Sequence, residues 1–262
     1  MMRRSGLALA AVTASMVLGA ALAHADVQWR ETMNERFDDG APERWTINEG
    51  GAGRIFSYRQ PQNVKSGEGS LALLTRAEKR EGKEWTTGMV VAKDFLQQYG
   101  YFEARLKITE APQINNAFWL MQRPPRLGDG QCELDIAEIR YPGKIMTNVH
   151  WDAGPDKGKR ANMRPYEMDV DLSQDFHTYG FLWTEKRLAW YFDGKLIRTE
   201  RNPGCTAEAR VRFSTAVMTK PGRENPQADG TAMEVQSLRV FAYEGDEPSV
   251  RDLPPDAMMA SK

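Results

Sequence analysis

Apolar and polar residues alternate with a period of two along much of the chain between Asp26 and Tyr243. The clearest case is residues 101–108, which read Tyr-Phe-Glu-Ala-Arg-Leu-Lys-Ile. In an extended strand, successive side chains point to opposite faces, so Glu103 and Arg105 share the polar face of this segment. The alternation therefore predicts a β-strand with one face buried.

Further strand-like runs cover residues 147–151, 178–184, 188–192, 195–197, 211–217 and 233–242. Asp193 and Gly194 separate two of these runs, and an Asp-Gly pair in that position predicts a tight hairpin. Pro and Gly clusters punctuate the chain, and sustained helical periodicity is missing from the sequence. We predict one all-β domain over residues 26–244, a two-sheet antiparallel β-sandwich or jelly roll, followed by a surface tail at residues 245–262.

The first residues are typical of a targeting segment. Arg3 and Arg4 precede an apolar run at residues 7–22, and Ala23-His24-Ala25 matches a cleavage site. The run is shorter than a bilayer-spanning helix requires. We predict a signal peptide at residues 1–25, export to the periplasm or the extracellular space, and no membrane association after cleavage.

Composition excludes some partners and leaves the cysteine chemistry open. The formal net charge is −1 and the sequence has no basic stripe, which argues against nucleic acid as a partner. Cys132 and Cys205 form either one disulfide or two separate thiols. Cysteines and histidines are too few and too scattered for a metal site, so we predict no metal. We also predict no cofactor and a monomer.

The segment from Glu133 to Ile139, Glu-Leu-Asp-Ile-Ala-Glu-Ile, has the strongest chemical character. Glu133 and Asp135 share one face of a regular strand, whereas Glu138 has the opposite parity. One inserted residue near Ile136 and Ala137, a β-bulge, would bring Glu138 to the face of Glu133. We therefore predict a bulge between Asp135 and Glu138.

Such a bulged strand would gather three carboxyl groups. They could not all ionise easily, so at least one pKa should rise, as a general acid near neutral pH requires. Two carboxyl groups about 5–5.5 Å apart are the arrangement of a retaining glycosidase. Taken alone, the same acids could form a solvated strand face or a calcium site.

Four sequence blocks strengthen the chemical interpretation. They are Tyr-Gly-Tyr-Phe-Glu-Ala-Arg at 99–105, Ala-Phe-Trp-Leu-Met at 117–121, the acidic strand at 133–138, and the hairpin at 176–194 with Phe-His-Thr-Tyr, Trp-Thr and Trp-Tyr-Phe-Asp-Gly. In order and spacing they resemble the family 16 glycoside hydrolases, the laminarinase, lichenase, agarase and carrageenase group. The resemblance implies a concave, concanavalin-like jelly roll with a long sugar cleft, and hydrolysis with retention by double displacement.

The resemblance also assigns residues. It implies Glu133 as the nucleophile, Glu138 as the acid/base, and Asp135 as their hydrogen-bonding partner. The positions matching substrate-binding residues of the family are Glu103, Arg105, Trp119 and His150. Trp183 and Trp190 are expected in the core.

Some alternatives stay open. Gln236 stands where the family commonly has an acid, which weighs against its structural calcium. The sequence does not choose between a β-1,3-glucan and a marine galactan as the polysaccharide substrate. A non-catalytic sugar-binding module on the same sandwich, and a transglycosylase that uses the same carboxylates, are the competing functions.

Overall fold

The structure is a computed structural model that describes residues 26–38, 43–51, 54–122, 132–154, 158–219 and 226–257. The predicted signal peptide at residues 1–25 lies outside the described residues. Within the described ranges, no helix has the length and apolar character needed to span a membrane.

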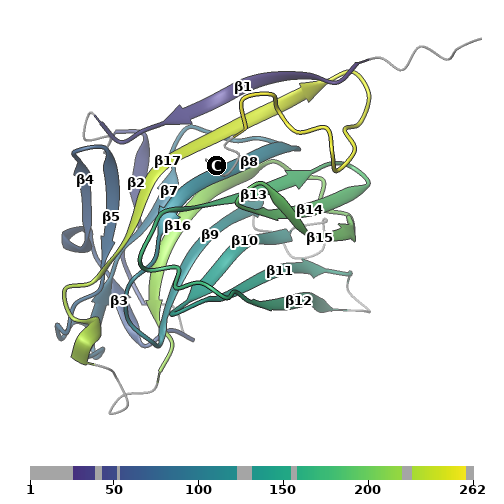
Figure 1. Ribbon diagram of the computed structural model, residues 1–262. Coiled ribbons are helices and arrows are strands. Elements are labelled where there is room, and N and C mark those ends of the chain that lie inside the picture. Colours follow the sequence, from purple (N-terminus) through teal and green to yellow (C-terminus); the bar gives the residue numbers. More distant parts are fainter. Residues whose placement is uncertain are drawn as a thin grey trace, which may run out of the picture.

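Two antiparallel sheets form the molecule (Figure 1). The first has eight strands in the order β15-β14-β13-β8-β17-β5-β4, with β1 also paired to β17. Its strands are β1 (Gln28–Glu35), β4 (Val64–Gly67), β5 (Ser70–Leu74), β8 (Gly100–Lys107), β13 (His177–Trp183), β14 (Arg187–Phe192), β15 (Lys195–Arg201) and β17 (Ala232–Glu244). We call it the outer sheet.

The second sheet has seven strands in the order β12-β11-β10-β9-β16-β7-β2. Its strands are β2 (Trp45–Ile47), β7 (Met89–Ala92), β9 (Ile114–Gln122), β10 (Cys132–Arg140), β11 (Lys144–Asp152), β12 (Lys159–Glu167) and β16 (Ala209–Val217). We call it the site sheet, because β10 carries the acidic segment. A small parallel pair, β3 (Ser57–Arg59) with β6 (Trp85–Thr87), and two 3-10 turns, η1 (Pro61–Asn63) and η2 (Pro226–Ala228), complete the described elements.

One hydrophobic core lies between the two sheets. It takes Phe102 and Leu106 from β8, Leu134 from β10, and Phe118 and Phe213 from β9 and β16, all fully buried. The last two rings stack with centroids 5.0 Å apart. Burying a side chain of this size stabilises the fold by about 1.5–3 kcal/mol, so the core makes the site sheet a firm support.

The predicted sandwich is confirmed, and each predicted strand lies within or largely within an observed one. The Asp-Gly hairpin is also present, with φ of 46° at Asp193 and 72° at Gly194. Two consecutive positive φ angles are the signature of a type I′ turn, whose twist matches that of the flanking strands. Trp183 and Trp190 are fully buried, as expected.

The segment after β17 is packed against the outer sheet rather than extended into solvent. Val250, Leu253 and Ala257 contact a cluster that includes Tyr191, whose hydroxyl donates to the Val250 carbonyl at 2.7 Å. Apolar contacts and a buried hydroxyl fix this part of the predicted tail. Residues 258–262 lie outside the described ranges.

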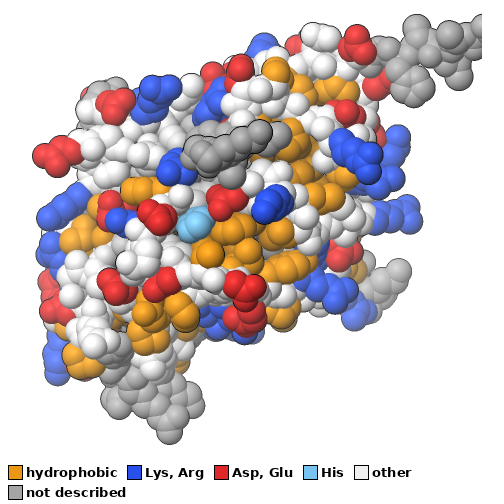
Figure 2. Space-filling model, in the orientation of Figure 1, with side chains coloured by type: hydrophobic (Ala, Val, Ile, Leu, Met, Phe, Trp, Pro, Cys, Tyr) orange, Lys and Arg blue, Asp and Glu red, His pale blue; other side chains and the backbone are white. Residues whose placement is uncertain are grey.

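On the face drawn in Figure 2, acidic and basic side chains are interspersed around an apolar area.

Cys132 and Cys205 form a disulfide, with their Cα atoms 5.5 Å apart and a sequence separation of 73. Both are buried. The bridge ties the first residue of β10 to the connection between β15 and β16, which links the two sheets. It therefore anchors the strand that carries Glu133 to the other layer of the sandwich.

Candidate active site

The predicted bulge is present in β10. Its pairing with β11 shifts register between Asp135 and Glu138, and its pairing with β9 shifts between Asp135 and Ala137. Ile136 and Ala137 consequently both enter the core. The extra residue returns Glu138 to the face of Glu133, which is the effect expected of a bulge.

The backbone at the bulge is held from the opposite sheet. The indole Nε1 of Trp190, on β14, donates to the Asp135 carbonyl at 3.0 Å. At the start of the strand, the Cys132 amide donates to Gln122 Oε1 at 2.8 Å. A bulge leaves local backbone groups without ladder partners, so these bonds satisfy groups that would otherwise destabilise the strand.

The carboxylates are joined by amide side chains. Asn148 Nδ2 donates to Asp135 Oδ2 at 2.9 Å and to Glu138 Oε2 at 2.7 Å. Asn115 Nδ2 donates to the other oxygen of Glu138. Both oxygens of the Glu138 carboxyl are therefore bound, which fixes its orientation toward Asp135 and stabilises its ionised form.

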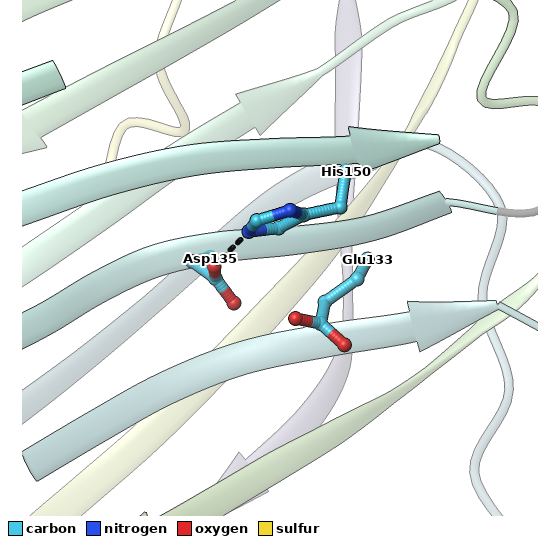
Figure 3. Close-up of side chains that lie close together, drawn as sticks. All are labelled: Glu133, Asp135 and His150. Atoms are coloured by element: carbon cyan, nitrogen blue, oxygen red, sulfur yellow. Dashed lines mark ion pairs between the residues drawn. The ribbon is translucent and has the colours of Figure 1, made fainter. Parts of the chain in front are cut away.

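His150 lies on the other side of Asp135. It is directly opposite Glu133 in the β10–β11 pairing, and its Nε2 is 3.4 Å from Asp135 Oδ2. Figure 3 shows the imidazole beside Asp135, with the Glu133 carboxylate next to the pair. Alternation explains the grouping, because Asn148 and His150 are two residues apart and share a face of β11.

Both glutamates have raised pKa values. Burial, followed by the charge of Asp135, raises the pKa of Glu133 to about 7. The same two causes raise the pKa of Glu138, while hydrogen bonds from Asn115 and Asn148 act against the rise. The hydrogen bond to Asp135 raises the pKa of His150 against the effect of its burial. The cluster therefore retains a proton near neutral pH.

Two adjoining hollows lie over this face of the site sheet. The Trp119 hollow is lined by the three carboxylates and by residues of β3, β9 and β16. The Trp151 hollow is lined by Glu133 and His150 and by residues of β11 and β12. Glu133 and Arg54 line both. The hollows thus run across the strands from β12 to β16, with the acids between, and they correspond to the predicted cleft.

Trp119 lines the hollow that carries its name. Its indole Nε1 donates to Ser214 Oγ at 3.1 Å, and the guanidinium of Arg212 lies 4.7 Å from the ring centroid. One face of the ring is therefore covered by a cation. The contact of Trp119 with sugar stays a prediction, and Arg212 was not expected beside the ring.

Glu103 and Arg105 are not part of this site, so the prediction that they line the cleft is wrong. Both are on β8 in the outer sheet. Because Phe102 and Ala104 enter the core, alternation turns Glu103 and Arg105 to the opposite face of the outer sheet, away from the site sheet, where Glu103 is nevertheless buried. The alternation identified the polar face correctly, but it does not say to which sheet a strand belongs.

Two groups of side chains bear on metal binding. Ligand atoms of Glu133, Asp135 and His150 lie within 4.8 Å of one another, and these residues belong to the carboxylate site itself. Gln236 accepts a hydrogen bond from Arg105 Nε at 2.8 Å. A side chain bound to a guanidinium does not fit as a calcium ligand, so the structural calcium implied by the resemblance is not supported here.

Several site residues have no separate signal in the sequence. Asn115 and Asn148 bind Glu138, and Arg54 and Arg59 line the Trp119 hollow. Asn148 could have been found from its parity with His150. Arg59 could not, because β3 reaches the site only through tertiary folding.

A two-sheet sandwich with paired carboxylates on a bulged strand defines the architecture of a polysaccharide-cleaving class of proteins. The profile of Glycosyl hydrolases family 16 matches residues 54–220, and the chain belongs to this family. Endo-1,3-1,4-beta-glycanase ExsH of Rhizobium meliloti is 30% identical over 171 residues, which are 63% of this chain and 35% of ExsH. The kappa-carrageenase of Pseudoalteromonas carrageenovora is 25% identical over 238 residues, which are 74% of this chain and 60% of the relative.

Solved structures share the fold. The laminarinase from Rhodothermus marinus superposes with a TM-score of 0.73 at 22% identity, covering 83% of this chain and 99% of the laminarinase. The chain spans only 35% of the length of ExsH. The match to ExsH therefore concerns about a third of that relative.

Proposed function

We propose that this protein is a retaining endo-glycosidase that hydrolyses internal bonds of a β-glucan or a marine galactan by double displacement. The observation that carries the proposal is the bulge in β10, which puts Glu133, Asp135 and Glu138 on one face inside a hollow. The roles of the two glutamates follow the family resemblance. The raised pKa values of both support acid–base chemistry near neutral pH.

The reaction needs one proton on the glutamate pair. Protonated Glu138 gives its proton to the glycosidic oxygen while the Glu133 carboxylate attacks the anomeric carbon, so the leaving chain departs as an alcohol. Water then gives a proton to the Glu138 carboxylate, and the oxygen of this water displaces Glu133 from the anomeric carbon. Two inversions restore the original configuration.

Neighbouring groups suit these two stages. Asn115 and Asn148 stabilise Glu138 as a carboxylate, the form that accepts a proton from water. The charges of His150 and Arg212 lower the pKa of Glu133 and so favour the carboxylate that attacks. Asp135 acts in the opposite direction on both glutamates and keeps one proton in the cluster.

Export belongs to the same proposal. The charged start, apolar run and Ala-His-Ala site at residues 1–25 support a signal peptide. The disulfide between Cys132 and Cys205 suits an oxidising compartment. We therefore propose a periplasmic or extracellular enzyme that acts on polysaccharide as a monomer.

Purified protein should release reducing ends from at least one of laminarin, mixed-linkage glucan, agarose, porphyran and κ-carrageenan. On that polymer, Glu133→Gln should lower kcat about 10⁴-fold or more, because the covalent intermediate can no longer form. Full activity of Glu133→Gln would contradict the nucleophile assignment. Binding without cleavage would favour a sugar-binding module, and products longer than the substrate would favour a transglycosylase.

Azide distinguishes the roles of the two glutamates. In Glu133→Ala, azide can fill the space of the missing carboxylate and attack once, giving a glycosyl azide of inverted configuration. In Glu138→Ala, azide attacks the covalent intermediate instead, giving a product of retained configuration. The same product configuration from both variants would contradict the assigned roles.

A further inference from the structure

A second bulge lies in β15, at the edge of the outer sheet. Trp190 of β14 is opposite Arg198 of β15, and the next pair along the two strands skips Ile197. Ile197 packs against the core, and Arg198, which follows it, is buried. An inserted residue turns the next side chain to the other face of a strand. The bulge in β15 therefore places a guanidinium between the two sheets.

Arg198 reaches the site sheet with both ends of its guanidinium. Its Nη1 donates to the carbonyl of Thr147 on β11 and, at 2.9 Å, to the Oγ1 of the same residue. Its Nη2 donates to the Asn162 carbonyl on β12 at 3.3 Å. A guanidinium carries its donors in a fixed, planar fork, so one side chain binds two neighbouring strands of the site sheet.

Thr147 lies directly opposite the bulge in β10. In the pairing of β10 with β11, Asp135 is opposite Asn148 and Glu138 is opposite Met146. Thr147 therefore faces the two-residue bulge between them. A bulge interrupts the ladder of backbone hydrogen bonds, so the guanidinium from β15 binds β11 at the point where the ladder is disturbed.

The other strand is held at the same point by Trp190, whose indole donates to the Asp135 carbonyl at 3.0 Å. The guanidinium of Arg198 lies 4.3 Å from the centroid of this ring, which is a cation–π contact. The two side chains thus act together at the bulge. Trp190 binds β10, and Arg198 binds β11.

Packing alone does not call for an arginine at this place. Burial lowers the pKa of Arg198, while the charge of Glu200 at 3.3 Å acts against that effect. The Nε of Arg198 is buried without a partner among the described residues. Taking a guanidinium out of water costs free energy that an apolar side chain of similar volume would not lose. The hydrogen bonds to β11 and β12 are what an apolar residue could not supply.

We propose that Arg198 is a positioning residue of the active site, which fixes Thr147 and thereby orients the Glu138 carboxyl group. The connection runs through Asn148, which follows Thr147 and donates to Glu138 Oε2 at 2.7 Å and to Asp135 Oδ2 at 2.9 Å. A shift of β11 at Thr147 moves this amide away from both carboxyl groups. The inference rests on the proposed function, because it names a further residue on which that reaction depends.

Arg198→Met is the main test, because methionine keeps an apolar side chain in the core but has no donors. On the polymer that is cut, kcat should fall about tenfold while KM changes less than about threefold, since the defect is in orientation and not in binding. Loss of the Asn148 hydrogen bond also raises the pKa of Glu138, so the basic limb of the pH profile should move to higher pH. The charged groups that act on the glutamate pair itself stay in place, namely Asp135, Arg140, His150 and Arg212.

Coupling to Asn148 distinguishes positioning from a general loss of stability or charge. In protein that already carries Asn148→Ala, Arg198→Met should lower kcat by less than about twofold, because the connecting residue is gone. Arg198→Lys keeps the charge and one donor, so it should recover part of the activity. Trp190→Phe removes the indole donor and should lower kcat with the same shift of the basic limb. These two variants carry the test if Arg198→Met does not fold.

Arg239→Met is the matched control. Arg239 is also an arginine of the outer sheet with limited exposure, and it pairs with Glu31 at 2.7 Å on the face away from the site sheet. Its loss should lower the melting temperature, while kcat stays within about twofold of the parent and the basic limb does not move. A loss of kcat in Arg239→Met equal to that in Arg198→Met would show that both arginines act only on stability.

Carboxyl NMR of glutamate-labelled protein separates this inference from the proposed function. The Glu138 signal, assigned by its absence in Glu138→Gln, should titrate at higher pH in Arg198→Met than in the parent. If the signal moves but the unmodified protein cuts no polymer, the positioning of Glu138 by Arg198 stands and the hydrolase proposal fails. If a polymer is cut and Arg198→Met changes neither kcat nor the signal, the hydrolase proposal stands and the inference fails. A loss of kcat that persists in full beside Asn148→Ala would overturn the inference as well.

Discussion

Glu103 and Glu133 are glutamates on central strands of the two sheets, both facing away from the core. Glu103, on β8, is fully buried, accepts a hydrogen bond from the Tyr101 hydroxyl, and lies 3.9 Å from Arg239 Nη1. Glu133, on β10, has Asp135 and Glu138 as charged neighbours and lines an open hollow. One glutamate is surrounded by groups that neutralise it, and the other by groups that resist its ionisation.

The difference shows how a structural acid can be told from a chemical one. A cation and a hydroxyl donor beside a carboxylate favour its charged form, so such a group is poorly suited to exchange protons near neutral pH. Like charges beside a carboxyl group in a hollow raise its pKa, so the group can both release and accept a proton near neutral pH. The neighbours, rather than the residue type or its place on a strand, decide which role is open.

Among the variants that probe this difference, we expect Asn148→Ala, beside the carboxylates of β10, to have the largest effect on activity. Asn148 positions Asp135 and Glu138 through one amide nitrogen, at 2.9 and 2.7 Å. Without it, the Glu138 carboxyl is less well oriented, and kcat should fall roughly 100-fold with a smaller change in KM. Since that hydrogen bond lowers the pKa of Glu138, the basic limb of the pH profile should also move to higher pH.

Asn116→Ala is the matched control for Asn148→Ala. Asn116 is on the opposite face of β9 from the site and donates to Thr109 Oγ1 and to the Ile139 carbonyl. Its loss should lower the melting temperature while the activity of the folded fraction keeps its pH profile. An unchanged pH profile in Asn148→Ala would show that Asn148 has only a structural role.

Glu103→Gln should act on stability instead of catalysis. Glutamine keeps the size but removes the charge that faces Arg239, and Arg239 retains Glu31 at 2.7 Å. We expect the free energy of unfolding in urea to fall by about 2 kcal/mol, with kcat within about twofold of the parent. A large loss of kcat in a stably folded Glu103→Gln protein would contradict the conclusion that Glu103 has no part in the active site.

Sequence reasoning went furthest where local geometry decides the outcome. Alternation predicted the strands, and Asp193-Gly194 predicted the hairpin. The parity of Glu138 predicted the bulge, at which Ile136 and Ala137 both enter the core. These features depend on neighbours along the chain. A period of two fixes which residues share a face, and one wrong parity reveals an inserted residue.

Sequence reasoning failed where the outcome depends on which elements meet. Alternation grouped Glu103 with Arg105 but did not reveal that β8 belongs to the outer sheet. The arrival of Arg59 beside the carboxylates depends on how β3 is placed, and the disulfide depends on the approach of Cys132 to Cys205 across 73 residues. Such contacts are set by tertiary packing, which a single sequence does not encode in any local pattern.

Glu133→Gln should stabilise the protein at alkaline pH, the reverse of Glu103→Gln. The pKa of Glu133 is about 7 in the folded protein against an ordinary value of 4.5, so between these pH values the folded state holds a proton that the unfolded chain has released. The free energy of unfolding contributed by Glu133 therefore falls as pH rises through this window. Glutamine does not ionise, so Glu133→Gln should exceed the parent by about 1–2 kcal/mol at pH 8, after allowance for partial exposure, and the gain should shrink toward pH 5. Urea unfolding of both proteins at pH 5, 6.5 and 8 measures this difference. A loss of stability at pH 8 would mean that the neighbours of Glu133 compensate its charge as fully as those of Glu103 do.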